Sequence, residues 1–396
     1  MTILLLVIIY IAFISLGLPD SLFGVSWPVI HIEYGLDEGF ASLYAIIVSA
    51  GTTTVSFIAG PLIRKWGTGW VTAISVLLTA VGLLGIGLSS NVWLMIPSAI
   101  ILGIGAGAVD TGLNDYVSKH YKPRHMSWLH CFWGIGVTVS PIIMSQFLEN
   151  STWHNGYTTI SIIQFVLAAV MFLSLPLWRR NSIQHKKEEI NDTLKVETKT
   201  EKFNVFKEKG AVLAGISLAV YCGMEYLIGI WGASFLVNVH AFTPALAAQY
   251  ISLYYGGIMI GRFFVGLFTM KLSNKTLIRA GLGFALIGAI MLSIPVDGLV
   301  LPALFLIGFG FAPIFPCTID STKSRFNPKY SADIIGFQMG CAYVGAFAIQ
   351  FSVGFIATRT SFIILPFILL GLGVLLFISI EQINKITSKQ ITSIIK

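Results

Sequence analysis

One apolar stretch of the sequence holds groups that could carry a proton, namely residues 102–116, LGIGAGAVDTGLNDY. Asp110 and Asn114 are four residues apart, so on a helix this carboxylate and this amide share one face. A charged group at membrane depth is unfavourable and usually faces a cavity or a partner. The alternative is that Asp110 lies close enough to its helix end to reach water. Gly103 and Gly105 would let a neighbouring helix approach closely.

Two further carboxylates lie in apolar runs. Asp20 follows Pro19 in LGLPDSLFGVSWP, where the missing proline donor weakens the helix. Asp20 could take part in proton transfer or could cap the broken backbone. Glu225 lies near the middle of its run, in YCGMEYLIGIWGASF, without a charged neighbour in sequence. Apolar surroundings disfavour the charged form of a carboxylate, which suits a group that takes up and releases protons. We predict that Asp20, Asp110 and Glu225 couple proton movement.

A second set of polar and aromatic residues could contact a solute. In MSWLHCFWGIGVTVSP, His130 could carry a proton or only form hydrogen bonds, and Trp133 could stack on a sugar ring or simply pack. Arg262 is the one cation inside an apolar run, and it could pair with Asp110 or extend to the interface. The predicted solute-binding residues are Asn114, His130, Trp133, Tyr221, Trp231, Arg262, Gln338 and Tyr343.

The composition indicates a membrane protein. The chain has 396 residues, of which 55% are hydrophobic and 11% are charged, a balance that soluble globular domains do not have. The net charge of +7 does not indicate nucleic acid, because the basic residues fall in short loops. The four cysteines lie in apolar runs and indicate neither disulfides nor a metal. No basic stretch precedes the apolar run that begins at Ile3, so we expect a retained helix and no cleaved signal peptide.

No enzyme signature stands out. The sequence holds no phosphate-binding glycine loop followed by Lys and Ser or Thr, and no pair of histidines at metal-ligand spacing. We therefore expect no enzyme activity, no metal and no cofactor. The energy for moving a solute across the membrane would therefore come from an ion gradient or from the solute's own gradient.

Twelve apolar runs predict twelve transmembrane helices. Their approximate bounds are 3–30, 41–62, 70–89, 92–117, 126–148, 157–178, 210–237, 245–269, 276–295, 299–320, 333–357 and 361–381. An even number places both termini on one side, and 23 of the 25 Lys and Arg residues fall on that side. Cytoplasmic loops are enriched in these residues. We therefore expect a monomer in the inner (cell) membrane with both termini in the cytoplasm.

The two halves of the chain repeat. At an offset of 205, Gly103 falls on Gly308 and Asp20 falls on Glu225. Parallel repeats of this kind surround a site at mid-membrane and rock against each other. The polar stretch between the halves has too few apolar residues to bury a core. We expect an N-terminal six-helix bundle at 1–178, a cytoplasmic linker at 179–209 and a C-terminal six-helix bundle at 210–396.

At these residues the chain resembles the major facilitator superfamily, and within it the fucose permease-like branch of sugar/proton symporters. The matching positions are Asp20 in LPD; Asp110, Thr111 and Asn114; His130, Phe132 and Gly136; Tyr221, Gly223 and Glu225; and Gly261, Arg262 and Phe263. The resemblance implies an all-α membrane protein with twelve transmembrane helices in two parallel six-helix repeats. It also implies that the acids of the first and fourth helices act in proton coupling and sugar binding.

The chain departs from the wider superfamily in the loop after the second run. The usual pattern Gly-x-x-x-Asp-Arg/Lys-x-Gly here runs from Gly60 to Gly67, with Arg64 in place of the aspartate. The usual charge latch between helices therefore cannot form in its usual way, although the sugar branch often lacks that aspartate too. Asp110 is shorter than the glutamate of fucose permease, which leaves the solute open.

We expect a secondary transporter that imports a sugar or related polyhydroxylated solute together with protons by alternating access. Sodium is the alternative coupling ion. The main alternative function is proton-antiport export of drugs or amphipathic metabolites, which the aromatic residues would suit. A third is a membrane sensor or lipid-handling protein that binds without moving a solute. The expected partners are the solute, the ion and the lipid bilayer, with no nucleic acid.

Overall fold

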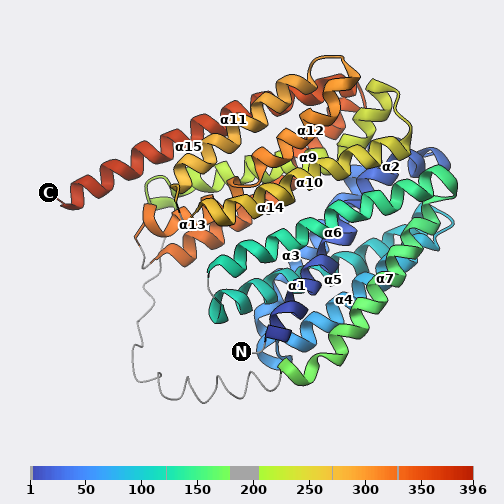
Figure 1. Ribbon diagram of the computed structural model, residues 1–396, viewed down its shortest axis with the longest axis horizontal. Coiled ribbons are helices and arrows are strands. Elements are labelled where there is room, and N and C mark those ends of the chain that lie inside the picture. Colours follow the sequence, from blue (N-terminus) through green and yellow to red (C-terminus); the bar gives the residue numbers. More distant parts are fainter. Residues whose placement is uncertain (1–2, 122, 179–204, 270, 328–329, 396) are drawn as a thin grey trace.

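The computed structural model describes residues 3–121, 123–178, 205–269, 271–327 and 330–395. Within these ranges the regular structure is helical (Figure 1). The helices of the N-terminal half are α1 (Ile3–Asp20), α2 (Leu22–Glu33), α3 (Phe40–Trp66), α4 (Thr68–Gly87), α5 (Val92–His120), α6 (Pro123–Asn150) and α7 (Trp153–Leu173). Those of the C-terminal half are η1 (Val205–Lys207), α9 (Ala211–His240), α10 (Pro244–Phe268), α11 (Asn274–Leu292), α12 (Asp297–Phe311), α13 (Ile314–Arg325), α14 (Ser331–Ala357), η3 (Phe362–Ile364) and α15 (Leu365–Ile395).

The number of membrane-length helices agrees with the prediction. In the described part of the chain, 11 helices are long and apolar enough to cross a membrane, or 12 when the bent helix α3 is taken as one span. This confirms the predicted all-α membrane fold. The expected linker at 179–209 lies mostly outside the described residues, so the division of the chain at that point stays a prediction.

Prolines interrupt three of the spans. The first span is broken between α1 and α2 at Ser21, two residues after Pro19, as the sequence predicts. The tenth is broken between α12 and α13, where Ala312 and Pro313 form a turn. Helix α3 bends by 54° after Ser56, and Pro61 lacks the N–H that would bond the carbonyl four residues earlier. Each break leaves backbone groups that need protein or water around them.

Close helix packing repeats between the two halves of the chain. A Cβ atom added at Gly103 on α5 would overlap the Val48 carbonyl on α3, and one at Gly308 on α12 would overlap the Tyr254 carbonyl on α10. Gly103 and Gly308 differ by 205 positions, and Val48 and Tyr254 differ by 206. Two more contacts repeat at these offsets: Gly82 with Leu102 and Gly288 with Ile307, and Gly105 with Thr79 and Gly310 with Ala285. The sequence repeat is thus a repeat of backbone-to-backbone contacts.

The two ends of the bundle differ in charge. The basic end carries the loops that join α3 to α4, α5 to α6, α10 to α11 and α13 to α14, with Arg64, Lys65, Lys271 and Lys275 in or beside them. The opposite end carries the loops that join α2 to α3, α4 to α5, α6 to α7 and α9 to α10. In Figure 1 the N-terminal helices (blue to green) and the C-terminal helices (yellow-green to red) lie side by side.

The two halves touch at the opposite end. Asn238 Nδ2 on α9 donates a hydrogen bond of 3.0 Å to Glu38 Oε1, in the loop before α3. A Cβ atom at Gly24 on α2 would overlap the Gly229 carbonyl on α9, so these two backbones are in direct contact. These contacts join the two halves at this end.

We predict that Gly308→Ala destabilises the protein by about 1–3 kcal/mol, because overpacking of a close contact forces the backbones apart. The measurement is the thermal unfolding midpoint of the purified protein in detergent. Gly371→Ala in α15 is the matched control, since a Cβ atom there meets nothing within 4 Å. Equal midpoints for the two variants would contradict the role given to the repeated glycine contacts.

Candidate functional site

A cavity of about 250 Å³ lies between the two halves, and helices from both of them line it. Its wall includes all three carboxylates singled out in the sequence: Asp20 from α1, Asp110 from α5 and Glu225 from α9. Asp20 is exposed to the cavity, Asp110 is half-buried, and Glu225 is 8% exposed. Three acids on one cavity between matching halves make it the candidate site.

A chain of contacts crosses the cavity from Asp20 to Glu225. Trp133 Nε1 on α6 donates a hydrogen bond of 2.8 Å to Asp20 Oδ2. The Arg262 guanidinium on α10 lies over the same indole, with its central carbon 4.8 Å from the ring centroid. Arg262 Nη2 then lies 3.4 Å from Glu225 Oε1. The indole therefore links a carboxylate of the N-terminal half to an ion pair of the C-terminal half. We name these four residues the cross-cavity chain.

Arg262 pairs with Glu225 and not with Asp110. Pairing of Arg262 with Asp110 was one of the two alternatives left by the sequence, because the two residues lie at similar depths in their helices. That pairing was wrong, since similar depth does not show which way each helix face points. The pair is nearly enclosed, with side chains 8% and 11% exposed, and the Arg262 Nε atom has no hydrogen-bond partner among the described residues. Tyr254 donates to the Glu225 backbone carbonyl at 3.1 Å and so helps to position that turn of α9.

Asp110 accepts a hydrogen bond from the Asn114 amide, which the sequence spacing predicts on the same helix face. Asn114 Nδ2 donates to Asp110 Oδ1 at 2.8 Å and to the Asp110 backbone carbonyl at 2.9 Å. The amide of Asn114 thus orients the carboxylate, and Asn114 itself is outside the cavity lining. Thr52 on α3 bonds the Gly103 carbonyl at 3.1 Å, which fixes α5 against α3 beside this acid.

His130 and Tyr343 also line the cavity. The His130 ring is edge-on to Phe13 and to Phe315, with ring centroids 5.7 Å and 6.2 Å away. Within the described part of the chain the His130 nitrogens form no hydrogen bond, which leaves them able to bind a solute hydroxyl. Tyr343 on α14 lies beside Ser56 on α3, so it approaches the N-terminal half from across the cavity.

Three predicted solute-binding residues lie behind the cavity wall. Tyr221 is fully buried next to Glu225, with its ring against Phe311. Trp231 is fully buried, and its Nε1 donates to the Gln350 backbone carbonyl at 3.0 Å. Gln338 is fully buried, and its Oε1 accepts from Thr322 at 2.8 Å. None of the three is part of the cavity lining. Tyr221 and Trp231 contact residues that line it, whereas Gln338 contacts Thr322, which does not.

The sequence analysis missed six polar residues of the wall. They are Tyr44, Ser49 and Thr52 on α3, Tyr157 on α7, Tyr226 on α9 and Gln350 on α14. Gln350 is an amide in an apolar run, the same signal that singled out Gln338, and could have been found in that way. Tyr44 and Tyr157 carried no such signal, because they lie near helix ends, where tyrosine is common at a membrane interface. Tyr226 lies in the middle of α9, next to Glu225, and offered neither a charge nor an amide.

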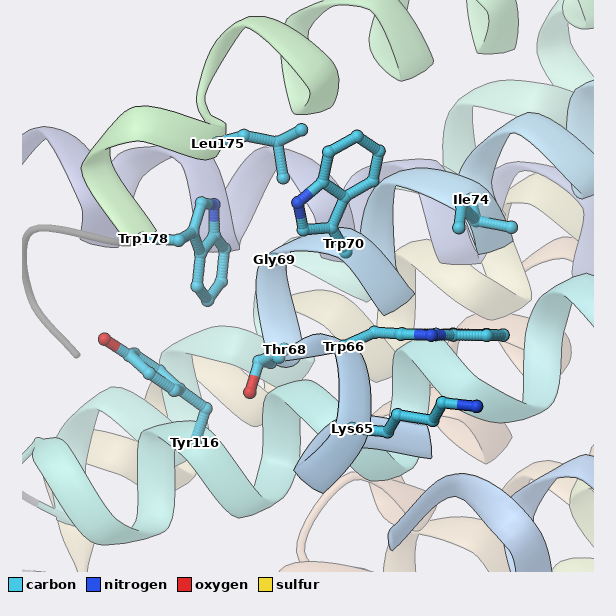
Figure 2. A pocket seen from close by; sticks show the side chains of 10 residues that line it. Lys65, Trp66, Thr68, Gly69, Trp70, Ile74, Tyr116, Leu175 and Trp178 are labelled. Atoms are coloured by element: carbon cyan, nitrogen blue, oxygen red, sulfur yellow. The ribbon is translucent and has the colours of Figure 1, made fainter. Parts of the chain in front are cut away.

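A second cavity, of about 490 Å³, lies at the basic end (Figure 2). Trp66, Trp70, Trp178 and Tyr116 surround it, and Lys65 is the one charged residue among the described residues that line it. It lies within the N-terminal half, and the described residues that line it include no carboxylate. The central cavity is therefore the better candidate for solute passage.

A bundle of membrane-length helices in two matching halves, with a polar cavity between them, defines a multi-pass membrane transporter. The sequence profile of the Major Facilitator Superfamily matches residues 9–350, and the chain belongs to that family. The protein is accordingly a transporter and not an enzyme.

Relatives and solved structures agree with this family. The chain is 22% identical over 380 residues to the "Glucose/mannose transporter GlcP" of Bacillus subtilis (strain 168), with 92% of each chain covered. It is 27% identical over 155 residues to the "Multidrug efflux pump SdrM" of Staphylococcus aureus (strain N315), covering 37% of this chain and 33% of that one. The fold is similar to that of a bacterial homolog of the human lysosomal transporter Spinster, in an inward-facing and occupied conformation, with a TM-score of 0.65 at 13% identity and coverage of 90% and 82%.

We predict that Glu225→Gln lowers the free energy of unfolding by about 3 kcal/mol, because it leaves the buried Arg262 without a counter-ion. The double variant Glu225→Gln/Arg262→Gln should recover most of the loss. Thermal unfolding in detergent measures both. Glu381→Gln is the control, since its pair with Arg279 is partly exposed and should contribute less than about 1 kcal/mol. A double variant less stable than Glu225→Gln would contradict the pairing.

Proposed function

We propose that the protein imports a sugar or related polyhydroxylated solute together with protons, by alternating access of the central cavity. The observation that carries this proposal is the cross-cavity chain, Asp20–Trp133–Arg262–Glu225. It couples an acid of one half to an ion pair of the other through one indole. A change of protonation at either end therefore alters the contact between the halves.

Charge balance supports proton binding in the cavity. Among the described residues of its lining, Arg262 is the one permanent cation, whereas Asp20, Asp110 and Glu225 are three acids. This excess of acids leaves two of the three carboxylates without a permanent cation in the described wall, so they are available to bind a coupling ion such as H⁺. The same excess would suit Na⁺, which carboxylates also bind. Uptake measured with a proton gradient and with a sodium gradient distinguishes the two ions.

Solute and proton would bind together in the following way. Asp20 receives the proton first, because it is the most exposed of the three acids. Transfer to Glu225 releases Arg262, whose unused Nε and freed Nη2 then donate to solute hydroxyls. Arg262 cannot itself lose a proton, so it serves as the fixed cation around which the acids exchange theirs.

Residues around the cross-cavity chain suit a solute rich in hydroxyl groups. His130 and Tyr343 each offer a donor and an acceptor, and Asn114 holds Asp110 in place. The name of the Bacillus subtilis relative, a glucose/mannose transporter, supports the same class of solute. The high density of Lys and Arg at the basic end supports a cytoplasmic position for that end and for both termini. The proposed transporter is a monomer.

We predict that proteoliposomes with this protein concentrate one or more neutral hexoses when the outside is made acidic. The measurement is uptake of radiolabelled sugars from a panel, with a proton gradient, with a sodium gradient and with none. Empty liposomes are the control. Concentration driven by sodium alone would contradict proton coupling, and absence of sugar flux under all three conditions would contradict the proposed solute class.

We predict that Glu225→Gln and Asp110→Asn each abolish concentrative uptake but spare counterflow. An amide resembles the protonated acid in size and in having both a donor and an acceptor, but it cannot release a proton, so exchange of solute continues without coupling. Counterflow in the same vesicles serves as the folding control. If both variants still concentrate sugar, the proton is carried elsewhere.

Export of drugs or amphipathic metabolites by proton antiport is the second candidate. Phe13, Phe23 and Phe315 form apolar parts of the cavity wall, and the partial match to the multidrug efflux pump of Staphylococcus aureus supports this class. Such a protein would move apolar cations such as ethidium outward in exchange for protons. Ethidium flux without flux of any hexose would favour this function over sugar import.

A further inference from the structure

Besides Arg262 Nε, two buried polar atoms in the wall of the central cavity have no hydrogen-bond partner among the described residues. Tyr44 is 4% exposed and Gln350 is 1% exposed, and both line the cavity. Among the described residues, neither the Tyr44 hydroxyl nor the Gln350 Oε1 atom has a hydrogen-bond partner. An unpaired buried polar group is unfavourable by about 1–3 kcal/mol, so such groups are rarely kept without a role.

These two groups come from different halves and line the same cavity of about 250 Å³. Tyr44 is on α3 in the N-terminal half, and Gln350 is on α14 in the C-terminal half. The two helices touch, since Ser42 Oγ on α3 lies 2.9 Å from where a Cβ atom of Gly354 on α14 would be. A solute that bonds to both groups would therefore bridge the halves.

Neighbouring contacts hold the two side chains in place. The Tyr44 ring stacks on Phe23, with centroids 3.7 Å apart and an interplanar angle of 8°. The Gln350 backbone carbonyl accepts from Trp231, which fixes that turn of α14. The phenol ring is therefore fixed against Phe23, and the backbone that carries the Gln350 side chain is fixed at the wall.

We propose that Tyr44 and Gln350 form a hydroxyl-binding subsite that is distinct from the cross-cavity chain. Its ligand is a neutral solute with at least two hydroxyl groups, one to bond the Tyr44 oxygen and one to donate to Gln350 Oε1. The proposal rests on the proposed function, since it assigns these contacts to the transported solute. It adds that the solute is bound by both halves through two groups other than the three acids.

The test compares Tyr44→Phe and Gln350→Met with the unaltered protein in hexose counterflow. Each substitution removes a hydrogen bond to the solute and keeps the side-chain size, so KM should rise about 3- to 10-fold. The thermal unfolding midpoint of the empty protein should stay unchanged or rise, because each change removes an unpaired buried polar group. A purely structural role would lower the midpoint without this effect on KM.

Tyr121→Phe is the matched control. The Tyr121 hydroxyl is also buried without a hydrogen-bond partner among the described residues, but Tyr121 is outside the cavity lining. Its loss should leave KM unchanged. Glucose analogues that each lack one hydroxyl group show which hydroxyl bonds to which side chain. The analogue that lacks the bonded hydroxyl should bind the unaltered protein and the matching variant equally weakly.

Different results would overturn the proposed function and the subsite. If the unaltered protein moves no neutral hexose or polyol, the proposed function and this subsite are both overturned. If it moves hexoses but Tyr44→Phe and Gln350→Met keep the KM of the unaltered protein, the subsite alone is overturned. A rise in KM that is equal in Tyr121→Phe would likewise overturn it.

Discussion

The ion pair between Arg262 and Glu225 is the constraint on which the arrangement of the cavity depends. A guanidinium stays charged at any ordinary pH, and a charge at membrane depth needs a partner or water. Here the partner is a single carboxylate oxygen at 3.4 Å, with Trp133 providing the face of its ring on another side. The Arg262 Nε atom remains without a partner among the described residues, so the pair leaves one donor of the guanidinium unused. In the proposed mechanism this one cation links the protonation of Glu225 to the binding of a solute.

Much of the fold follows from local features of the sequence. Apolar runs of membrane length give the spans, and Pro19 and Pro313 break two of them because proline cannot continue the helical hydrogen bonds. The repeat offset of 205 to 206 predicts matched glycine contacts, such as Gly103 and Gly308, because close backbone approach needs the absence of a side chain. The three carboxylates were identifiable for a similar reason, since each is a costly residue type in an apolar run.

The pairings inside the cavity could not be predicted in the same way. Spacing along one helix shows which residues share a face, but in a membrane both faces are apolar and the pattern does not show which one turns inward. For this reason the partner of Arg262, and the positions of Tyr221, Trp231 and Gln338 behind the wall, depend on how whole helices are rotated. Tyr44 and Gln350 are a related case, because their missing hydrogen bonds appear only when neighbouring helices are in place.

The central claim is that a proton enters with each solute molecule, and the most direct measurement is the internal pH of proteoliposomes after sugar is added. The vesicles contain a pH-sensitive dye and start with no gradient of any ion. The account predicts that a transported hexose added outside acidifies the interior at a rate that follows sugar entry. Entry of the same sugar at constant internal pH would contradict it.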